Sequence, residues 1–177
     1  MQLLQDRRRL FLILNFVIFL IPVNVYVIGD WLGTGIQWIL FRYQSTYLGD
    51  SILDVWKDLM YVMSGTMGWK TSIAWSLWVV AAGILVLSLI VHLLNYLTSV
   101  DGDRITGIII LAGSFLLLVS DLVQYGILFN GPAGFCIPLG IPLIMVCGWL
   151  LIRESEPVTV SGWWDNLRLA FSKSRSE

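Results

Sequence analysis

The sequence contains little charge. Charged residues make up 13% of its 177 residues, the net charge is −1, and hydrophobic residues make up 57%. Soluble domains usually carry about a quarter charged residues, so the composition argues against an ordinary soluble domain. The near-neutral balance gives no reason to expect a nucleic-acid partner. The composition indicates an integral membrane protein.

Motifs that carry out chemistry are also missing. The chain has one histidine and no HExxH, GxSxG or P-loop pattern, which are typical of zinc proteases, serine hydrolases and nucleotide-binding proteins. A single membrane aspartate is half of an aspartyl-protease dyad. We therefore expect no enzyme activity, no catalytic residue, no cofactor and no metal site.

Cysteine is scarce as well. Cys136 and Cys147 are eleven residues apart on one predicted helix, which separates them by about 16 Å along its axis. A disulfide needs Cα atoms within roughly 7 Å, so these two cysteines cannot pair with each other within one chain.

Long apolar segments are abundant. A helix needs about 20 apolar residues to cross ~30 Å of hydrocarbon. Four segments approach or exceed that length: 10–28, 72–97, 105–129 and 135–152. The first follows a basic cluster, as in a signal peptide, but it lacks a small-x-small cleavage site, so we expect an uncleaved anchor. The predicted fold class is all-α, an integral membrane four-transmembrane-helix bundle over residues 1–155.

Basic residues near the predicted spans are unevenly distributed. Membrane proteins carry an excess of Lys and Arg in their cytoplasmic segments. With the N-terminus inside, three basic residues lie outside, namely Arg42, Lys57 and Lys70. Eight lie inside: Arg7, Arg8, Arg9, Arg104, Arg153, Arg168, Lys173 and Arg175. The distribution predicts a multi-pass protein of the cell membrane with both termini cytoplasmic.

The segments outside the spans have patterns of their own. In the outer loop 29–71, Ser51 can cap an amphipathic helix over about 51–63. Segment 31–43 is too apolar for a solvated loop and is expected to be interfacial or re-entrant. In the cytoplasmic tail 156–177, Ser161 precedes a second amphipathic helix over about 162–172. Both helices are expected to lie on a membrane surface.

This outline resembles that of claudin-type tetraspan proteins. The shared features are four spans, a long first outer loop, an amphipathic helix before the second span and a short second outer loop. The resemblance is one of topology. The paired cysteines that staple the first loop in that family are absent here, so we assign no family.

Small residues recur at intervals of seven on the second and third spans. Such an interval drifts only about 20° per step around a helix, so each set forms one stripe. Membrane helices approach closely where side chains are small. We expect a helix-packing seam between these spans that contains Ala74, Ala81, Ser88, Gly107, Gly113 and Ser114.

Polar residues within the spans sort into two layers by their height along the helices. Asn24, Asp121 and Gln124 form an outer layer. No Lys or Arg within a span can pair with Asp121, and an ionised carboxylate in hydrocarbon is costly. The three residues are therefore a candidate ion or partner site. The alternative is a carboxyl group that hydrogen-bonds its neighbours, such as Asn24, Ser120 or Tyr125, and has no further role.

The inner layer consists of Asn15, His92 and Asn95. A single histidine without further ligands at metal-binding spacing is typical of a packed, hydrogen-bonded group. The two asparagines are expected to hold helices together, and contact with a substrate is the alternative.

The sequence leaves two functions open. The first is a non-enzymatic integral membrane protein, a structural or accessory subunit that acts through its outer loop and interfacial helices. The alternative is a small oligomeric channel or transporter subunit that uses intramembrane Asp121 as a proton or cation site. The expected partners are the lipid bilayer and either itself or other membrane proteins, with no nucleic acid.

Overall fold

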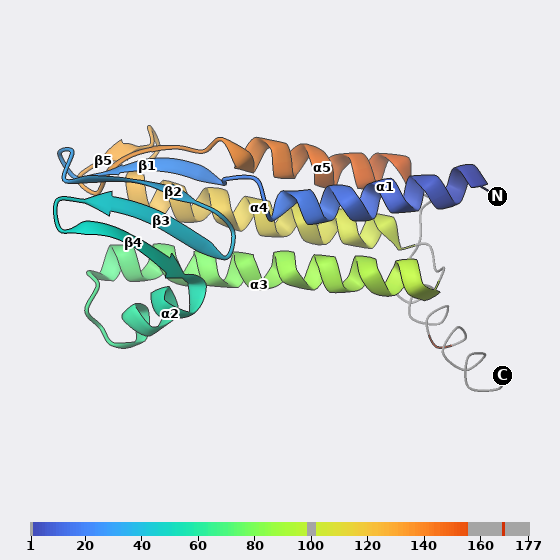
Figure 1. Ribbon diagram of the computed structural model, residues 1–177, viewed down its shortest axis with the longest axis horizontal. Helices are drawn as coiled ribbons and strands as arrows, with labels where there is room; N and C mark the ends of the chain where they lie inside the picture. Colours follow the sequence, from blue (N-terminus) through green and yellow to red (C-terminus); the bar gives the residue numbers. More distant parts are fainter. Residues whose placement is uncertain (1, 99–101, 156–167, 169–177) are drawn as a thin grey trace.

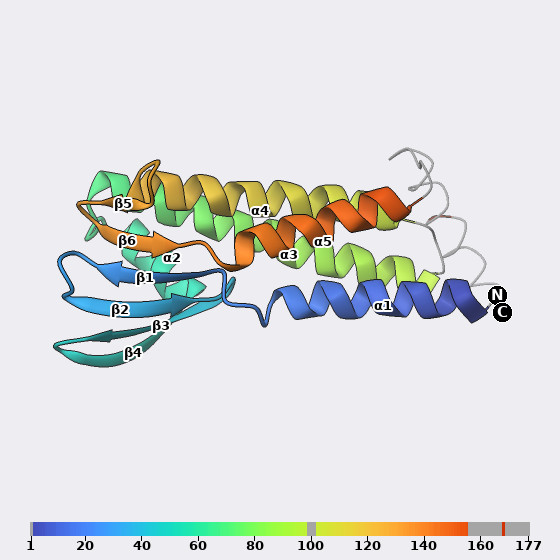
Figure 2. The same cartoon turned by 90° about the horizontal axis from the view of Figure 1, so that it is seen from above.

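The chain forms an elongated structure in which helices run along the long axis and a sheet lies at one end (Figure 1). The computed structural model describes residues 2–98, 102–155 and 168. In both Figure 1 and Figure 2, the N-terminus lies at the end opposite the sheet.

Five helices are present in the described part of the chain. They are α1 (Gln2–Ile18), α2 (Val55–Met63), α3 (Trp69–Thr98), α4 (Asp103–Tyr125) and α5 (Gly140–Glu154). By length and composition, two of the described helices could cross a membrane, α3 with 30 residues and α4 with 23. These two helices suggest an association with a membrane.

The segments between α1 and α2 and between α4 and α5 together form one six-stranded antiparallel sheet. Its strands are β1 (Asn24–Ile28), β2 (Gly33–Gln37), β3 (Phe41–Thr46), β4 (Gly49–Asp54), β5 (Asn130–Gly131) and β6 (Gly134–Ile137). Their order is β4-β3-β2-β1-β6-β5. Val25 of β1 lies opposite both Ile36 of β2 and Ile137 of β6, so two segments far apart in sequence build one sheet.

The prediction of an all-α four-transmembrane-helix bundle is therefore wrong. The predicted span 10–28 is interrupted: α1 ends at Ile18, and residues 24–28 form β1. Pro22 lies between them, and proline has no backbone N–H with which to continue a helix. The predicted span 135–152 begins with β6, and its helix starts only at Gly140.

The outer loop also differs from its prediction. Residues 49–54 form β4, and α2 begins only at Val55. The carboxylate of Asp54 accepts a hydrogen bond from the Lys57 backbone N–H at 2.8 Å, so Asp54 rather than Ser51 is the N-cap. Segment 31–43, expected to be interfacial or re-entrant, forms β2 and the start of β3. The predicted tail helix at 162–172 lies, apart from Arg168, outside the described residues.

Small residues on α4 allow two helices to approach it. A Cβ on Gly113 would lie 2.8 Å from Leu85 Cγ on α3, whereas a Cβ on Gly107 would lie 2.7 Å from the backbone oxygen of Gly148 on α5. The small residues of α4 thus serve two interfaces, and only part of the predicted seam faces α3. The other four members of that seam are all buried: Ala74, Ala81, Ser88 and Ser114.

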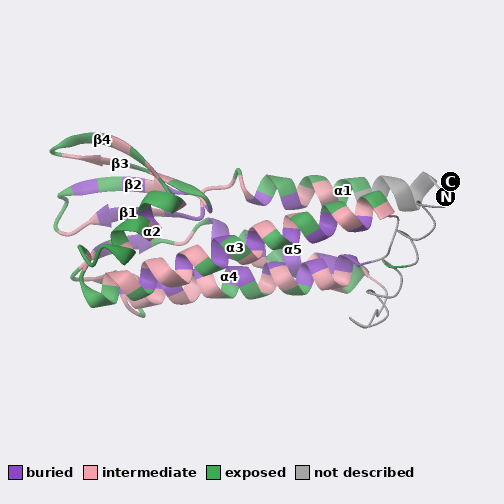
Figure 3. Cartoon of the chain, turned by 90° about the horizontal axis from the view of Figure 1, so that it is seen from below, coloured by how far each residue is buried: buried purple, intermediate pink, exposed green. Residues whose placement is uncertain are grey.

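The apolar core lies between the helices. Figure 3 shows buried residues along the inward faces of α3, α4 and α5, while exposed residues follow their outer faces. The largest fully buried side chains include Leu85, Ile110, Leu117, Ile144 and Leu151. Ile39, from the connection between β2 and β3, belongs to the same core and ties the sheet to the helices.

Candidate functional site

The outer polar layer lies where the sheet meets α4. Asn24 is the first residue of β1, and Asp121 lies one turn before the end of α4. The Asn24 Nδ2 donates to both carboxylate oxygens of Asp121, at 3.0 and 3.2 Å. Both side chains are buried. The structure thus brings together two predicted site residues that are 97 positions apart in the sequence.

Gln124, the third predicted member, lies beside a small cavity. Its Oε1 is buried and has no hydrogen-bond donor. The cavity has a volume of about 10 Å³ and is lined by Gln124, Asp121, Gln37 and the indole rings of Trp75 and Trp78, among others. That volume is close to the smallest that holds one water. The cavity therefore places an unpaired amide oxygen near a carboxylate.

Cys136, on β6, lies next to Asp121 on the sheet side of the site. It lies opposite Tyr26 in the register of β1 and β6 and packs in one cluster with Tyr26 and Tyr125. Burial raises the pKa of the Cys136 thiol, and the neighbouring Asp121 carboxylate raises it further. Cys136 and Cys147 are both free thiols, and Cys136 lies on a strand rather than on the helix that carries Cys147. Burial and the neighbouring carboxylate therefore both favour the protonated thiol.

A charged pair sits next to this site. Arg42 Nη2 donates to Asp58 Oδ1 at 2.8 Å, and the guanidinium lies 4.2 Å from the ring centre of Trp75. The pair joins β3 to α2 and α3. Burial raises the pKa of Asp58, and the Arg42 charge opposes that rise. Because the side chains of Arg42 and Asp58 are only 12% and 3% exposed, this ion pair lies within the fold rather than on its surface.

Tyr26 packs over a glycine in the centre of the sheet. A Cβ on Gly35 would lie 2.3 Å from the Tyr26 ring, so only glycine fits at this position. The Tyr26 hydroxyl is buried, and burial raises its pKa, an effect that the Arg42 charge opposes. β1 and β2 are therefore closely packed against each other at this position.

Three further hydrogen bonds fasten the sheet and the outer helix ends. Trp78 Nε1 donates to the backbone oxygen of Ile39 at 3.1 Å, which links α3 to the segment between β2 and β3. Trp38 Nε1 donates to the Leu20 oxygen, also at 3.1 Å. Between the two long helices, Ser120 Oγ donates to the backbone oxygen of Ala74 at 2.7 Å.

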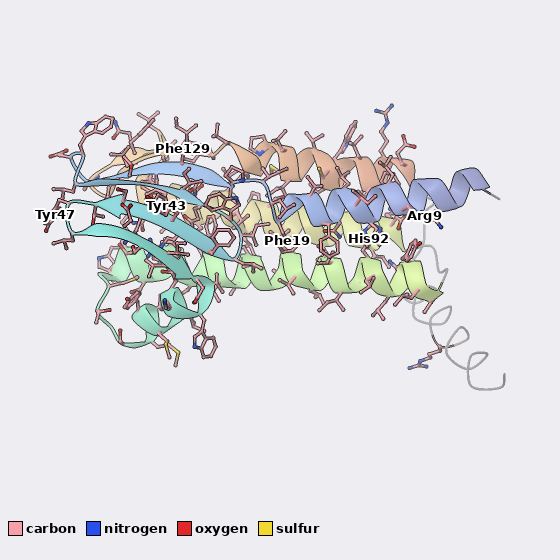
Figure 4. All side chains as sticks on the ribbon, in the orientation of Figure 1. Arg9, Phe19, Tyr43, Tyr47, His92 and Phe129 are labelled. Carbon is pink, nitrogen blue, oxygen red and sulfur yellow. The ribbon has the colours of Figure 1, made fainter. Side chains whose placement is uncertain are left out.

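The predicted inner layer forms a second polar network, within the helical part. Asn15 Nδ2 lies 3.3 Å from His92 Nδ1, and Ser88 Oγ donates to Asn15 Oδ1 at 3.4 Å. His92 Nε2 lies 3.6 Å from a carboxylate oxygen of Asp103, at the start of α4. Asn95 Nδ2 donates to the hydroxyl of Thr106 at 3.5 Å. These contacts join α1, α3 and α4 (Figure 4, His92).

Sequence reasoning missed Arg42 and Asp58. The available signal was Arg42 itself, the single charged residue in the apolar segment 31–43. A lone charge in such surroundings needs a partner because an unpaired buried charge is costly. The partner could not be identified, since Asp58 appeared on the polar face of a predicted surface helix.

The groups around the Asp121 carboxylate are hydrogen-bonding side chains: the Asn24 amide, the Gln124 amide and the Cys136 thiol. Within the described ranges, no group of three or more His, Cys, Asp and Glu side chains could hold a metal ion. No protein-family model matches the chain, and no curated protein matches it in sequence.

Proposed function

We propose that this chain is a non-enzymatic membrane protein that binds a partner protein through the outer face of its sheet. The sheet is the accessory or structural element, and the helical part holds it at the membrane. This proposal keeps the first of the two functions that the sequence left open and assigns the interaction to the sheet.

The proposed topology is multi-pass, with both termini cytoplasmic. α3 and α4 cross the bilayer, and α1 and α5 run beside them in the same apolar layer. The distribution of basic residues supports this orientation because Arg104 and Arg153 lie at the helix ends remote from the sheet, and Arg9 lies in the half of α1 remote from it. The sheet then lies on the outer side.

The observation that carries the proposal is an apolar row on the face of the sheet that points away from the helices. Side chains alternate along a strand, and Asn24 and Tyr26 face the helices, so the residues between them face outward. One register line crosses five strands and is apolar in every one: Ile137, Val25, Ile36, Tyr43 and Ile52. Ile52, at the edge strand, is 66% exposed.

Such a row fits a partner protein. Contiguous exposed apolar surface marks interaction sites in proteins. The opposite face of the same sheet is fastened by the Asn24–Asp121 and Arg42–Asp58 contacts, so the row is held on a rigid support. A rigid surface loses little conformational freedom on binding, which favours affinity.

Site-specific photocrosslinking in native membranes tests this proposal. A benzophenone amino acid at Ile52 should give a discrete crosslinked protein, identified by mass spectrometry. The matched control is the same probe at Asp50, which lies on the same strand and face, two residues away. Crosslinks to lipid alone at Ile52, or the same protein adducts at both positions, would show that the row is not a protein-binding surface.

The Asp121 cavity supports a second candidate, a small oligomeric channel or transporter subunit with a proton or cation site. The specific observation is the unpaired Gln124 Oε1 near the Asp121 carboxylate, since oxygen ligands suit hard cations. Reconstituted liposomes should then show proton or cation flux that is lost in Asp121→Asn while folding is kept. Absence of flux in the wild-type protein, or equal flux in the variant, would exclude this candidate.

A further inference from the structure

A pocket lies at the turns of the sheet, and these turns form the end of the sheet farthest from the N-terminus (Figure 1). It lies between the turn that joins β1 to β2 and the turn that joins β5 to β6, and its volume is about 230 Å³. A backbone hydrogen bond from Gly29 N to the oxygen of Ala133, at 3.0 Å, connects the two turns. The walls are therefore fixed relative to each other before anything binds.

The pocket combines one carboxylate with two aromatic rings. Asp30, Trp31 and Phe135 line it, together with Asn130 and the backbone of nearby glycines. The segments 29–35 and 126–135 contain no Lys, Arg or His. A carboxylate makes charge-assisted hydrogen bonds to a cationic group, and aromatic faces attract the same group through their π-electrons. We propose that this pocket binds a basic side chain, Arg or Lys, from a partner protein.

The size of the pocket suits one side chain. Pockets for drug-sized ligands usually occupy ~300–1,000 Å³, so about 230 Å³ is too small for such a molecule. A single guanidinium or ammonium group with its alkyl stem is a smaller ligand that can reach the carboxylate and the rings together.

The surroundings favour a protein as the source of that cation. Trp31 is 80% exposed, and Ile127 and Leu128, in the segment that leads into β5, are 87% and 85% exposed. A protein loop can cover these apolar groups while it inserts a basic residue, and a free ion cannot. A second copy approaching with the same end fits poorly because its turns 29–35 and 45–51 carry Asp30 and Asp50 and no basic residue.

The backbone beside the pocket is strained. Among the described residues other than glycine, Trp31 and Phe129 alone have positive φ, at 63° and 52°. Bulky residues rarely adopt this left-handed conformation, and where they do the surrounding structure enforces it, often at a functional site. One of these residues forms the pocket wall, and the other comes directly before Asn130. The fold therefore holds the backbone at these two residues against its local preference.

The test uses the full chain in lipid nanodiscs with 5-fluorotryptophan incorporated. The Trp31 fluorine resonance is assigned by its loss in Trp31→Phe. The probe is the peptide acetyl-Gly-Gly-Arg-Gly-Gly-amide, and its control carries citrulline, a neutral isostere, in place of arginine. The arginine peptide should shift the Trp31 resonance saturably, with a Kd on the order of millimolar because one side chain is bound. The citrulline peptide should not shift it.

Charge variants then locate the site. Asp30→Asn should raise the Kd of the arginine peptide at least about tenfold. Asp50→Asn removes a charge on the neighbouring hairpin and should change that Kd by less than about twofold. An equal rise in Kd for both variants would mean that the peptide is attracted by the overall negative charge and does not bind in the pocket. A Trp31 shift with choline chloride but not with the peptide would reassign the pocket to a lipid headgroup, and no saturable shift with either would overturn the proposal.

This inference rests on the proposed role of the sheet in binding a partner, and the two can fail separately. Photocrosslinking at Ile52 reports on the apolar row, whereas the peptide titration reports on the pocket. If this chain crosslinks to a partner at Ile52 but does not bind the arginine peptide, the proposed function stands and the pocket has no part in it.

Discussion

The two polar layers of the molecule differ in the quality of their contacts. In the outer layer, Asn24 contacts Asp121 at 3.0 and 3.2 Å, and in the charged pair beside it Arg42 contacts Asp58 at 2.8 Å. Protein N–H···O hydrogen bonds most often measure about 2.9–3.0 Å, so these contacts are close to optimal. They join a strand to a helix in each case, and both include a carboxylate.

The inner layer is looser. Its three principal contacts measure 3.3 Å for Asn15 with His92, 3.4 Å for Ser88 with Asn15, and 3.6 Å for His92 with Asp103. They join helices that apolar side chains already hold together. The comparison indicates that the outer layer determines where the sheet sits, while the inner layer adds little to contacts that packing already secures.

The largest expected effect comes from breaking the Arg42–Asp58 pair beside the outer layer. Arg42→Met leaves the Asp58 carboxylate buried without its partner, and such a loss typically costs about 3–5 kcal/mol in the free energy of unfolding. Equilibrium unfolding in detergent measures it. The double variant Arg42→Met with Asp58→Leu should recover most of the loss, because no buried charge remains. Equal losses in the single and double variants would contradict this account.

The same variant gives a pH test. Burial raises the pKa of Asp58, and removing Arg42 removes the charge that opposes this rise. The folded Arg42→Met variant then binds a proton more tightly than the unfolded chain does. Its stability relative to wild type should therefore improve as pH falls through the raised pKa, and worsen as pH rises through it. A destabilisation that does not change between pH 4 and 8 would show that lost packing, not charge, is the cause.

A smaller effect is expected from filling the space under Tyr26. Gly35→Ala places a Cβ 2.3 Å from the tyrosine ring, and overpacking of this kind costs about 1–3 kcal/mol. Gly68→Ala is the control, because no other atom lies within 4 Å of the added Cβ. Detergent unfolding midpoints compare the two. Similar midpoints would mean that Tyr26 moves easily away from Gly35 and that the sheet is not closely packed there.

The smallest expected effects come from one serine beside each layer. Ser120 lines the cavity at Asp121, and Ser88 contacts Asn15 in the inner network. Ser120→Ala removes a 2.7 Å hydrogen bond from α4 to α3, and Ser88→Ala removes a 3.4 Å bond to Asn15 and a bond within its own helix. Hydrogen bonds between membrane helices average about 0.6 kcal/mol and reach about 1.7 kcal/mol. We expect Ser120→Ala near the upper value and Ser88→Ala below the average. The reverse order in thermal unfolding would reverse the comparison of the layers.

Much of the helical part could be predicted from the sequence. The apolar segments 72–97 and 105–129 correspond closely to α3 and α4, because a helix satisfies all its backbone hydrogen bonds locally and its length follows from composition. Counting residues at 1.5 Å each also placed Asn24 and Asp121 at similar heights. The structure puts these two side chains in contact.

The sheet escaped prediction because its strands are short and few of them show a clear alternation of polar and apolar residues. In β1 and β2, one face packs on the helices and the other bears the apolar row, so the alternation of polar and apolar residues that marks a half-buried strand is weak. The preference of segment 24–28 for a helix or a strand depends on its partners. Those partners are β2, close by in the sequence, and β6, more than a hundred residues away.

The sequence alone determined that segments 72–97 and 105–129 are long and apolar enough to cross a membrane as helices, and that scarce polar residues gather at two heights, although it predicted four spans where the structure has two such helices. These properties depend on composition and on helical geometry, which are local. Only the tertiary structure decided that the outer segments form a sheet, that Arg42 pairs with Asp58, and that two turns enclose a pocket at Asp30. Each of these depends on backbone hydrogen bonds or charges between distant segments, and their free energy is gained only once folding has brought those segments together.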